Sequence, residues 1–167
     1  MEKDYKRILI VGDAGRGKST LAINLSKKLK IKNFSTDDFF WKKKFSVKED
    51  RERSIENISK IYDQNKWIVE GSTRSLVEGG LVRAEIIVYL KYPNLGACFW
   101  NLYMRNRNRK NESLIDLVKL YKHLFFKRYK IGNQKNKLGI EEMLSKFEEK
   151  VVYLKSFEDI NNFCAKI

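Results

Sequence analysis

The sequence has few residues that interrupt helices and strands, form disulfides or ligate metal ions. Its 167 residues include one Pro, two Cys and one His. The proline, Pro93, bars continuation of a strand and suits the start of a helix. Cys98 and Cys164 are far apart and lack metal-ligand spacing, so we interpret both as buried free thiols in a reducing compartment. A single histidine, His123, makes a metal cluster or a histidine-based catalytic triad a poor expectation.

Long apolar runs are missing as well. No run approaches the roughly 18 residues that a transmembrane helix needs. Residues 1–7 are rich in charge, and the apolar stretch at 8–11 is too short for a signal-peptide core. We therefore expect a soluble, cytoplasmic protein with no membrane partner. Hydrophobic residues make up 43% of the chain, which suits one domain, residues 1–167, around one core.

Acidic residues are scarce relative to basic ones, and the net charge is +14. Such a charge favours anionic partners but does not choose between nucleotides, nucleic acid and a membrane surface. Residues 100–139 carry eleven Lys and Arg against two acidic residues, so most of the excess lies in one stretch.

Short apolar runs alternate with amphipathic stretches along the chain. The runs predict strands at residues 7–12, 33–36, 67–71, 85–90 and 151–154. The stretches predict helices at residues 18–30, 48–65, 95–109, 114–131 and 157–167. This alternation indicates an α/β fold, a five-stranded parallel sheet with helices on both faces. Ligands bind such sheets at the carboxyl ends of the strands, where Gly12, Asp37, Glu70 and Gly71 all fall.

A complete G-x-x-x-x-G-K-[ST] motif lies between the first predicted strand and the first predicted helix. Its glycines let successive backbone N–H groups form an anion site, to which the helix adds its positive dipole end. Lys18 can reach the β- and γ-phosphates, and the Ser19 hydroxyl can ligate Mg²⁺. The motif predicts binding of a nucleoside triphosphate, ATP with Mg²⁺, and the alternative is a fortuitous glycine-rich turn. The predicted phosphate-binding residues are Gly12, Asp13, Ala14, Gly15, Arg16, Gly17, Lys18, Ser19 and Thr20.

Two motifs that would assign the triphosphate to other uses are absent. Neither Asn65-Lys66 nor Asn136-Lys137 continues into the N-K-x-D pattern of a GTPase. A motor ATPase would show four apolar residues before Asp, whereas this chain has Trp67-Ile-Val-Glu70. A small kinase acting on a small-molecule acceptor fits best. The competing class is a nucleotide-dependent regulator that binds nucleic acid through residues 100–139, a partner that we do not favour.

Three residues after the predicted strands are candidates for the acceptor side. Asp37 could accept a proton from an acceptor hydroxyl or hold Mg²⁺ through water, and its alternative role is a helix cap. Glu70 ends a buried run and should be paired, with Ser19 or the Mg²⁺ water shell, unless it forms a structural ion pair. Arg74 could clamp an acceptor anion, or lie solvated at the surface.

Arginines gather at the end of the predicted helix 95–109. Arg105 and Arg109 are four residues apart and share a face, with Arg107 between them. Guanidinium groups over the γ-phosphate would stabilise the charge that spreads during phosphoryl transfer. The alternative is a solvated basic helix end.

The order of these features resembles the adenylate-kinase-like nucleoside and nucleotide kinases. It is most similar to the small kinases known as DNA topology modulation proteins, through Thr36-Asp-Asp-Phe-Phe-Trp41 and Arg83-Ala-Glu85. The resemblance implies that Asp37 and Arg74 face a nucleoside or nucleotide acceptor. It also implies that Arg105 and Arg109 begin a helical lid formed by residues 110–139. Glu70-Gly-Ser-Thr-Arg74 departs from the Asp-Gly-Phe-Pro-Arg of adenylate kinases, which argues against AMP as the acceptor.

Overall fold

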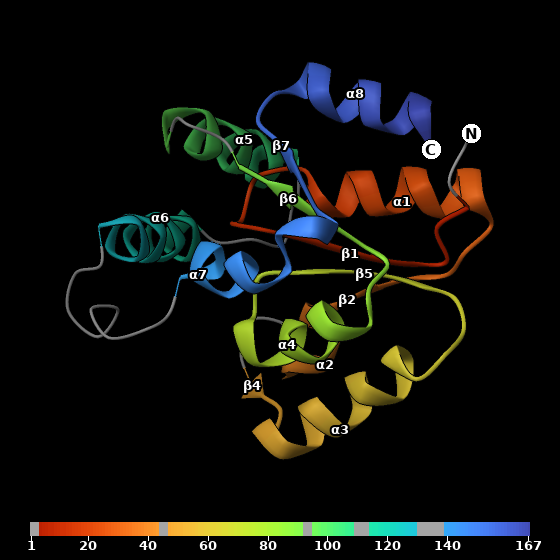
Figure 1. Ribbon diagram of the computed structural model, residues 1–167. Helices are drawn as coiled ribbons and strands as arrows, with labels where there is room; N and C mark the ends of the chain where they lie inside the picture. Colours follow the sequence, from red (N-terminus) through yellow and green to blue (C-terminus); the bar gives the residue numbers. More distant parts are fainter. Residues whose placement is uncertain (1–3, 44–46, 92–94, 109–113, 130–138) are drawn as a thin grey trace.

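The computed structural model is an α/β fold around a parallel sheet (Figure 1). It describes residues 4–43, 47–91, 95–108, 114–129 and 139–167. The sheet has five strands in the order β2-β5-β1-β6-β7. Their bounds are Arg7–Gly12 (β1), Asn33–Ser35 (β2), Trp67–Gly71 (β5), Ile86–Leu90 (β6) and Val151–Leu154 (β7). The predicted five-stranded parallel sheet is therefore confirmed.

The central strand β1 fixes the relative height of its neighbours. Ile10 of β1 pairs with Glu70 of β5 on one side and with Val88 of β6 on the other. On the far side of β5, Ser35 of β2 pairs with the same Glu70. Because all these strands are parallel, their carboxyl ends lie along one edge of the sheet.

Helices cover both faces of the sheet (Figure 1). One face is covered by α1 (Lys18–Leu29) and α8 (Phe157–Lys166), and the other by α3 (Arg51–Tyr62), α4 (Arg74–Arg83) and α7 (Ile140–Leu144). Alternate side chains of β1 belong to the two cores: Ile8 and Ile10 to the first, Leu9 and Val11 to the second. The three inner strands β1, β5 and β6 are thus buried on both faces, as a continuous apolar run predicts.

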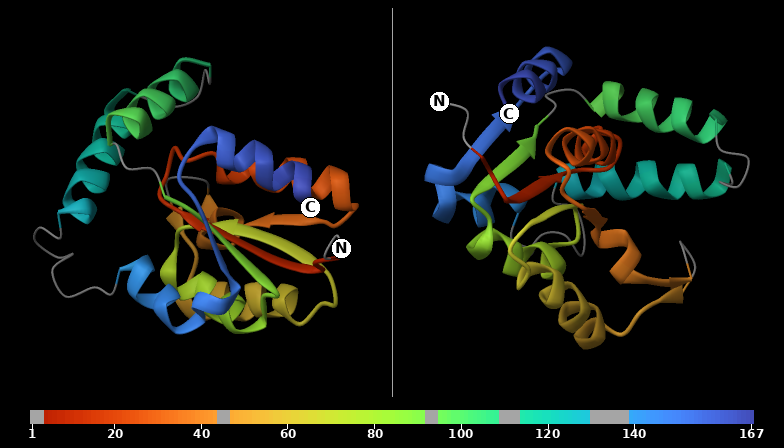
Figure 2. Two further views of the ribbon diagram at one scale, coloured as in Figure 1. Left: turned by 45° about the horizontal axis from the view of Figure 1, so that its top comes forward. Right: turned by 90° about the vertical axis from the view of Figure 1, so that its right-hand side faces the viewer.

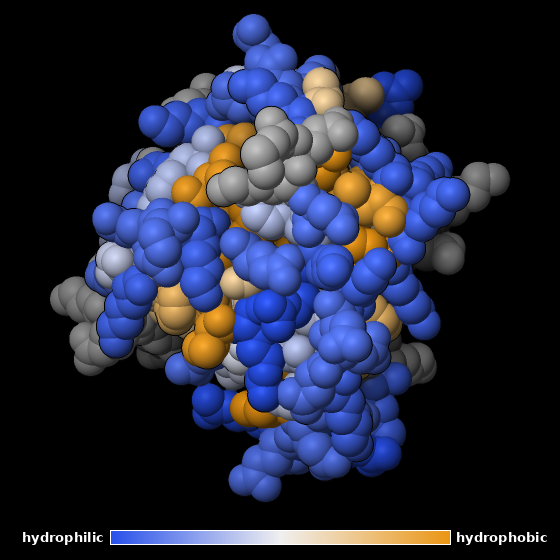
Figure 3. All heavy atoms as spheres, turned by 45° about the vertical axis from the view of Figure 1, so that its right-hand side comes forward, coloured by the Kyte–Doolittle hydropathy of each residue, from blue (hydrophilic) through white to orange (hydrophobic). Residues whose placement is uncertain are grey.

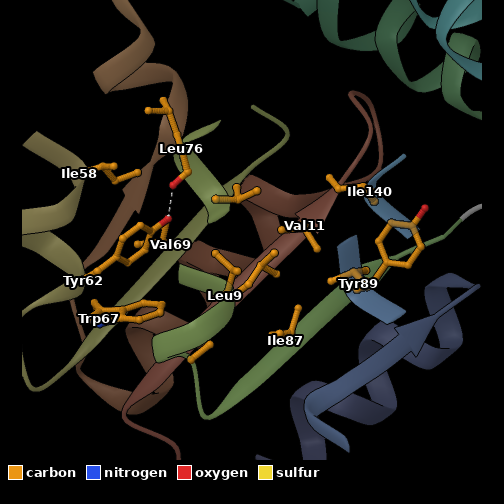
Figure 4. Close-up of a cluster of buried hydrophobic side chains, with 14 residues drawn as sticks. Leu9, Val11, Ile58, Tyr62, Trp67, Val69, Leu76, Ile87, Tyr89 and Ile140 are labelled. Atoms are coloured by element: carbon orange, nitrogen blue, oxygen red, sulfur yellow. Dashed lines mark hydrogen bonds between the residues drawn. The ribbon is translucent and has the colours of Figure 1, made fainter. Parts of the chain in front are cut away.

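Tyr62 belongs to the core under α3 and α4, where it lies beside Trp67 (Figure 4). Its ring packs edge-on against Trp67, and its hydroxyl donates a 2.8 Å hydrogen bond to the carbonyl of Leu76. Burial raises the pKa of this tyrosine, so the hydroxyl remains a donor.

The remaining elements surround the carboxyl edge of the sheet. After β2 come α2 (Thr36–Phe40) and a two-stranded antiparallel hairpin, β3 (Trp41–Lys43) with β4 (Val47–Lys48). Two antiparallel helices, α5 (Leu95–Asn108) and α6 (Leu114–Arg128), lie side by side at one end of the molecule (Figure 2). A 3₁₀ segment at Ser145–Lys150 connects α7 to β7.

Several predicted boundaries were wrong for local reasons. The helix expected at 48–65 begins at Arg51, because Asp50 accepts hydrogen bonds from the N–H groups of Glu52 and Arg53 and caps it. The first helix ends at Leu29, since Lys30 adopts a left-handed conformation with φ 56°. The strand expected at 33–36 stops at Ser35, and α2, α4 and the hairpin were not predicted.

The surface is largely hydrophilic on the face drawn in Figure 3, with apolar side chains in small separate patches. Within the described part of the chain, none of the helices has the length and apolar character that crossing a bilayer requires.

We predict that Tyr62→Phe lowers the free energy of unfolding by about 1–2 kcal/mol, because the buried carbonyl of Leu76 loses its donor. For a chain of this length the unfolding temperature should fall by roughly 2–8 °C. Tyr153→Phe is the matched control, since the Tyr153 side chain is 41% exposed and it should change stability by less than about 0.5 kcal/mol. Equal thermal unfolding of both variants would contradict the prediction.

Candidate phosphate-binding site

The loop from Gly12 to Lys18 joins the buried strand β1 to α1. Gly12, Gly15 and Gly17 all have positive φ, at 149°, 76° and 80°, conformations that side-chain-bearing residues rarely adopt. The N-terminus of α1 receives no side-chain cap from the described residues. The first N–H groups of α1 and the dipole of the helix are therefore directed at the loop, as in anion-binding sites.

Lys18 lies over this loop. Its side chain is 8% exposed, and Nζ donates a 2.8 Å hydrogen bond to the backbone carbonyl of Asp13. The ammonium group is thus held inside the loop rather than extended into solvent. Ser19 and Thr20, the next two residues of α1, are exposed.

Arg16, which was predicted to bind phosphate with the rest of the loop, has an inward-pointing side chain. It is 3% exposed, and its guanidinium group lies 3.5 Å from both the Leu90 carbonyl and the Asp13 carboxylate. The side chain therefore ties the loop to the end of β6. Ala14, at the loop tip, packs against the apolar cluster of α5 and α6 formed by Leu102, Leu117 and Leu124.

Glu70, the penultimate residue of β5, lies beside the loop and is 6% exposed. Its Oε1 accepts a hydrogen bond of 2.9 Å from Ser19 Oγ and one of 2.8 Å from Ser35 Oγ. The expectation that Glu70 would be paired with Ser19 is confirmed as a contact. Sequence reasoning missed Ser35, although a serine that ends a strand beside a buried glutamate is a natural partner for it.

Asp37 is the second residue of α2 and is half-buried. Ser35 occupies the cap position of this helix, and its Oγ accepts a 3.3 Å hydrogen bond from the Asp37 N–H. The alternative reading of Asp37 as a helix cap is therefore wrong. One serine links Asp37, through its backbone, to the carboxylate of Glu70.

Arg74 begins α4 and is half-buried. The next two residues line a cavity of about 240 Å³ between α2, β4, α3 and α4. The polar and charged side chains of this cavity are Lys48, Glu49, Arg51, Ser54 and Ser75, and Phe40 and Leu76 complete it. Lys48 and Arg51 give it cationic character that the sequence did not reveal, since both were assigned to a helix with no site.

Of the three arginines expected near the triphosphate, the structure describes the side chain of Arg107 alone. Arg105 belongs to α5, but its side chain lies outside the described part, and so does the whole of Arg109. Arg107 is exposed. Of the segment at 110–139, the structure describes α6, Tyr129 and Gly139, while the stretches at 110–113 and 130–138 lie outside it.

A second network binds the segment after residues 130–138 to the sheet. Glu141, in the first turn of α7, accepts a 3.0 Å hydrogen bond from the Tyr89 hydroxyl and pairs with Lys91 at 3.1 Å. Burial and the Glu141 carboxylate raise the pKa of Tyr89, which keeps its hydroxyl protonated as a donor. Tyr89 precedes Leu90, whose carbonyl contacts Arg16, so α7 is fixed close to the phosphate loop.

The side-chain oxygens beside the loop fit a Mg²⁺ ion that is bound mainly by phosphates. Among the residues that the structure describes, no three His, Cys, Asp or Glu side chains gather into a metal cage. Mg²⁺ in nucleotide sites takes only one or two protein oxygens and completes its shell with water and phosphate. The Ser19 hydroxyl, backed by the Glu70 carboxylate, provides that kind of donor.

Comparison with known proteins places the fold. No family model matches the sequence. Over 91 residues the chain is 32% identical to the uncharacterised protein YqaC of Bacillus subtilis strain 168, a match that covers 53% of this chain and only 50% of YqaC.

Solved structures match over nearly the whole chain. Shikimate kinase from Acinetobacter baumannii, in complex with shikimate, has a TM-score of 0.58 at 16% identity, covering 96% of this chain and 89% of that one. Shikimate kinase from Bacteroides thetaiotaomicron has a TM-score of 0.54 at 12% identity, covering 97% and 95%. The chain thus has the fold of these P-loop kinases, as predicted.

The close approach of Gly71 to α2 yields a prediction about the site. A Cβ at position 71 would lie 2.6 Å from the Cβ of Thr36 and would overlap the Thr36 hydroxyl. Gly71→Ala should displace α2 and lower the free energy of unfolding by about 1–3 kcal/mol.

Gly79→Ala is the control for the added methyl group. Its Cβ would be 3.3 Å from the Tyr62 ring, and alanine is favoured over glycine within a helix by about 1 kcal/mol. If Gly71→Ala unfolds at the wild-type temperature in the same thermal experiment, the packing of Thr36 on Gly71 is not a constraint.

Proposed function

We propose that the chain is an ATP-dependent phosphotransferase that moves the γ-phosphoryl group of Mg·ATP to a small acceptor. The observation that carries this proposal is the glycine loop before α1, with Lys18 held over it and Ser19 bonded to Glu70. Its setting in the fold of shikimate kinases supports it. The finer relation to DNA topology modulation proteins remains a prediction.

Each part of the loop has a task in this reaction. The backbone N–H groups of residues 12–20 cradle the phosphates, and Lys18 neutralises charge on the β- and γ-phosphoryl groups. Ser19 provides the protein oxygen for Mg²⁺, and Glu70 orients the Ser19 hydroxyl. Bound Mg²⁺ would supply positive charge that offsets the negative charge of the triphosphate.

We assign the acceptor to the cavity lined by Lys48, Arg51 and Ser75, which opens between the elements that carry Asp37 and Arg74. Two cationic side chains favour an acceptor that bears a carboxylate or phosphate as well as a hydroxyl. A nucleotide, as the sequence resemblance implies, has this chemistry, and so does a hydroxy acid such as the shikimate bound to the A. baumannii enzyme. Arg74 directly precedes the lining residue Ser75, and in this proposal it clamps the acceptor anion, while Glu70 stays with Ser19 on the metal side.

Asp37 is the proposed general base. A kinase must place an acceptor hydroxyl in line with the γ-phosphorus, and a half-buried carboxylate on α2, whose backbone N–H shares Ser35 with Glu70, is suited to that task. Arg105 and Arg109 are proposed to cover the triphosphate, with residues 110–139 as a helical lid. The contact of α5 and α6 with Ala14 supports this assignment, because it joins that helical pair to the loop.

Lys18→Ala tests the central assignment. We expect at least a ~100-fold fall in ATP turnover, the scale seen when a transition-state donor is lost, with the protein still folded by thermal unfolding. Turnover is measured against a panel of nucleosides, nucleotides and hydroxy acids. Undiminished turnover in the folded variant would exclude the phosphate loop as the active site. ATP binding without turnover of any acceptor in the wild type would favour the nucleic-acid-binding regulator instead.

Asp37→Asn separates acceptor chemistry from nucleotide binding. The substitution keeps the size of the side chain but removes its charge and proton affinity. Acceptor-dependent turnover should fall by at least ~100-fold, since general-base help is worth about 10²- to 10⁴-fold. Calorimetry with Mg·ATP should show a much smaller change in affinity. A variant that phosphorylates the acceptor at the wild-type rate would move the base to the surroundings of Glu70 and Arg74.

A further inference from the structure

The carboxylate of Glu70 is shared by two serines from different parts of the chain. Ser19 donates to it from the phosphate loop side at 2.9 Å, and Ser35 from the end of β2 at 2.8 Å. Both hydrogen bonds end on the same oxygen, Oε1. Since Glu70 is 6% exposed, these two donors are a large part of what replaces water around its charge.

Ser35 is held in place by more than this hydrogen bond. It pairs with Glu70 in the β2–β5 register, so its backbone position is fixed by the sheet. Its Oγ also accepts the N–H of Asp37 and so caps α2. Rotation of the Ser35 side chain would therefore break both the helix cap and the bond to Glu70.

The next residue pair makes a second, independent connection. Thr36 is completely buried, and it packs so closely on Gly71 that no side chain fits there. Glu70 and Gly71, at the end of β5, thus contact Ser35 and Thr36, where β2 ends and α2 begins. This arrangement couples the position of the Glu70 carboxylate to the position of α2, the helix that carries Asp37.

We propose that Ser35 is a positioning residue for the Mg²⁺ site, acting on Ser19 through Glu70. A hydroxyl group has one proton and two lone pairs. With Oε1 held by Ser35, Glu70 accepts the hydrogen bond of the Ser19 O–H group and leaves the Ser19 lone pairs directed away from the carboxylate, toward a cation. This inference rests on the proposed binding of Mg·ATP. It adds that the metal site is completed by a residue of the acceptor side.

Removal of the Ser35 hydroxyl should therefore weaken the binding of Mg²⁺ and leave the binding of the phosphates unchanged. Without its second donor the Glu70 carboxylate can rotate, and the Ser19 hydroxyl loses its fixed orientation. Partners that orient a metal ligand are typically worth 10- to 100-fold in metal affinity. Within the described part of the chain, the hydrogen bonds of the Ser35 hydroxyl run to Glu70 and Asp37, whereas the phosphates are assigned to the loop N–H groups and Lys18.

The test compares Ser35→Gly with Ser35→Thr. Glycine is an adequate helix cap, within a few tenths of a kcal/mol of serine, but donates no hydrogen bond to Glu70. Threonine retains the hydroxyl and its donor. Calorimetry measures the affinity for a non-hydrolysable ATP analogue with Mg²⁺ and with EDTA, and thermal unfolding is recorded for each variant.

We expect Mg²⁺ to tighten binding of the analogue in the wild type and in Ser35→Thr by a similar factor. In Ser35→Gly that factor should be smaller by about 10-fold, while the affinity measured in EDTA changes by less than about twofold. An unchanged effect of Mg²⁺ in Ser35→Gly would overturn the inference and leave the proposed function intact. An equal loss in Mg²⁺ and in EDTA would reduce Ser35 to a helix cap. Failure of the wild type to bind the analogue would overturn the proposed function and this inference together.

Discussion

The site depends on the parallel pairing of β1 between β5 and β6. This register pairs Val11 with Gly71 and Gly12 with Leu90, so the phosphate loop leaves the sheet where β5 ends, just after Glu70, and where β6 ends in the carbonyl that Arg16 contacts. Ser19 then reaches Glu70 of β5, and Arg16 reaches Leu90 of β6, the two strands that lie directly beside β1. The apolar pairs inside both cores hold this register, because a slip of one residue would exchange the two faces of each strand.

Much of this arrangement can be predicted from the sequence, since its determinants are local. Strands buried on both faces appear as continuous apolar runs, and the glycine motif follows the first of them. From these two signals the parallel sheet, the loop and the nearness of Glu70 to Ser19 could be predicted. The expected ends of β1, β5 and β7 were right, because a glycine or a polar pair stops each run.

What the sequence did not predict depends on contacts between distant segments. Helix α4 has two glycines and little amphipathic pattern, and it forms because it packs on Tyr62. The cationic cavity is similar: Lys48 and Ser75 are 27 positions apart, and they meet only because α3, which follows Lys48, packs against α4. Ser35 resembles any serine at a strand end until its neighbour across the sheet is known to be a buried glutamate.

The position of α5 and α6 has a consequence for any closing motion of the site. The two helices share the buried leucines 102, 117 and 124, and the same cluster includes Ala14 at the tip of the loop. A motion that swings this pair away from the loop must expose that apolar contact. Burial of apolar area costs about 25 cal/mol per Å² to undo, so the contact with Ala14 favours keeping the pair seated. A lid in this protein would then close most easily around a helical pair that already rests on the phosphate loop. In that case the Lys and Arg side chains of α5 and α6 would act from helices that packing already holds against the phosphate loop.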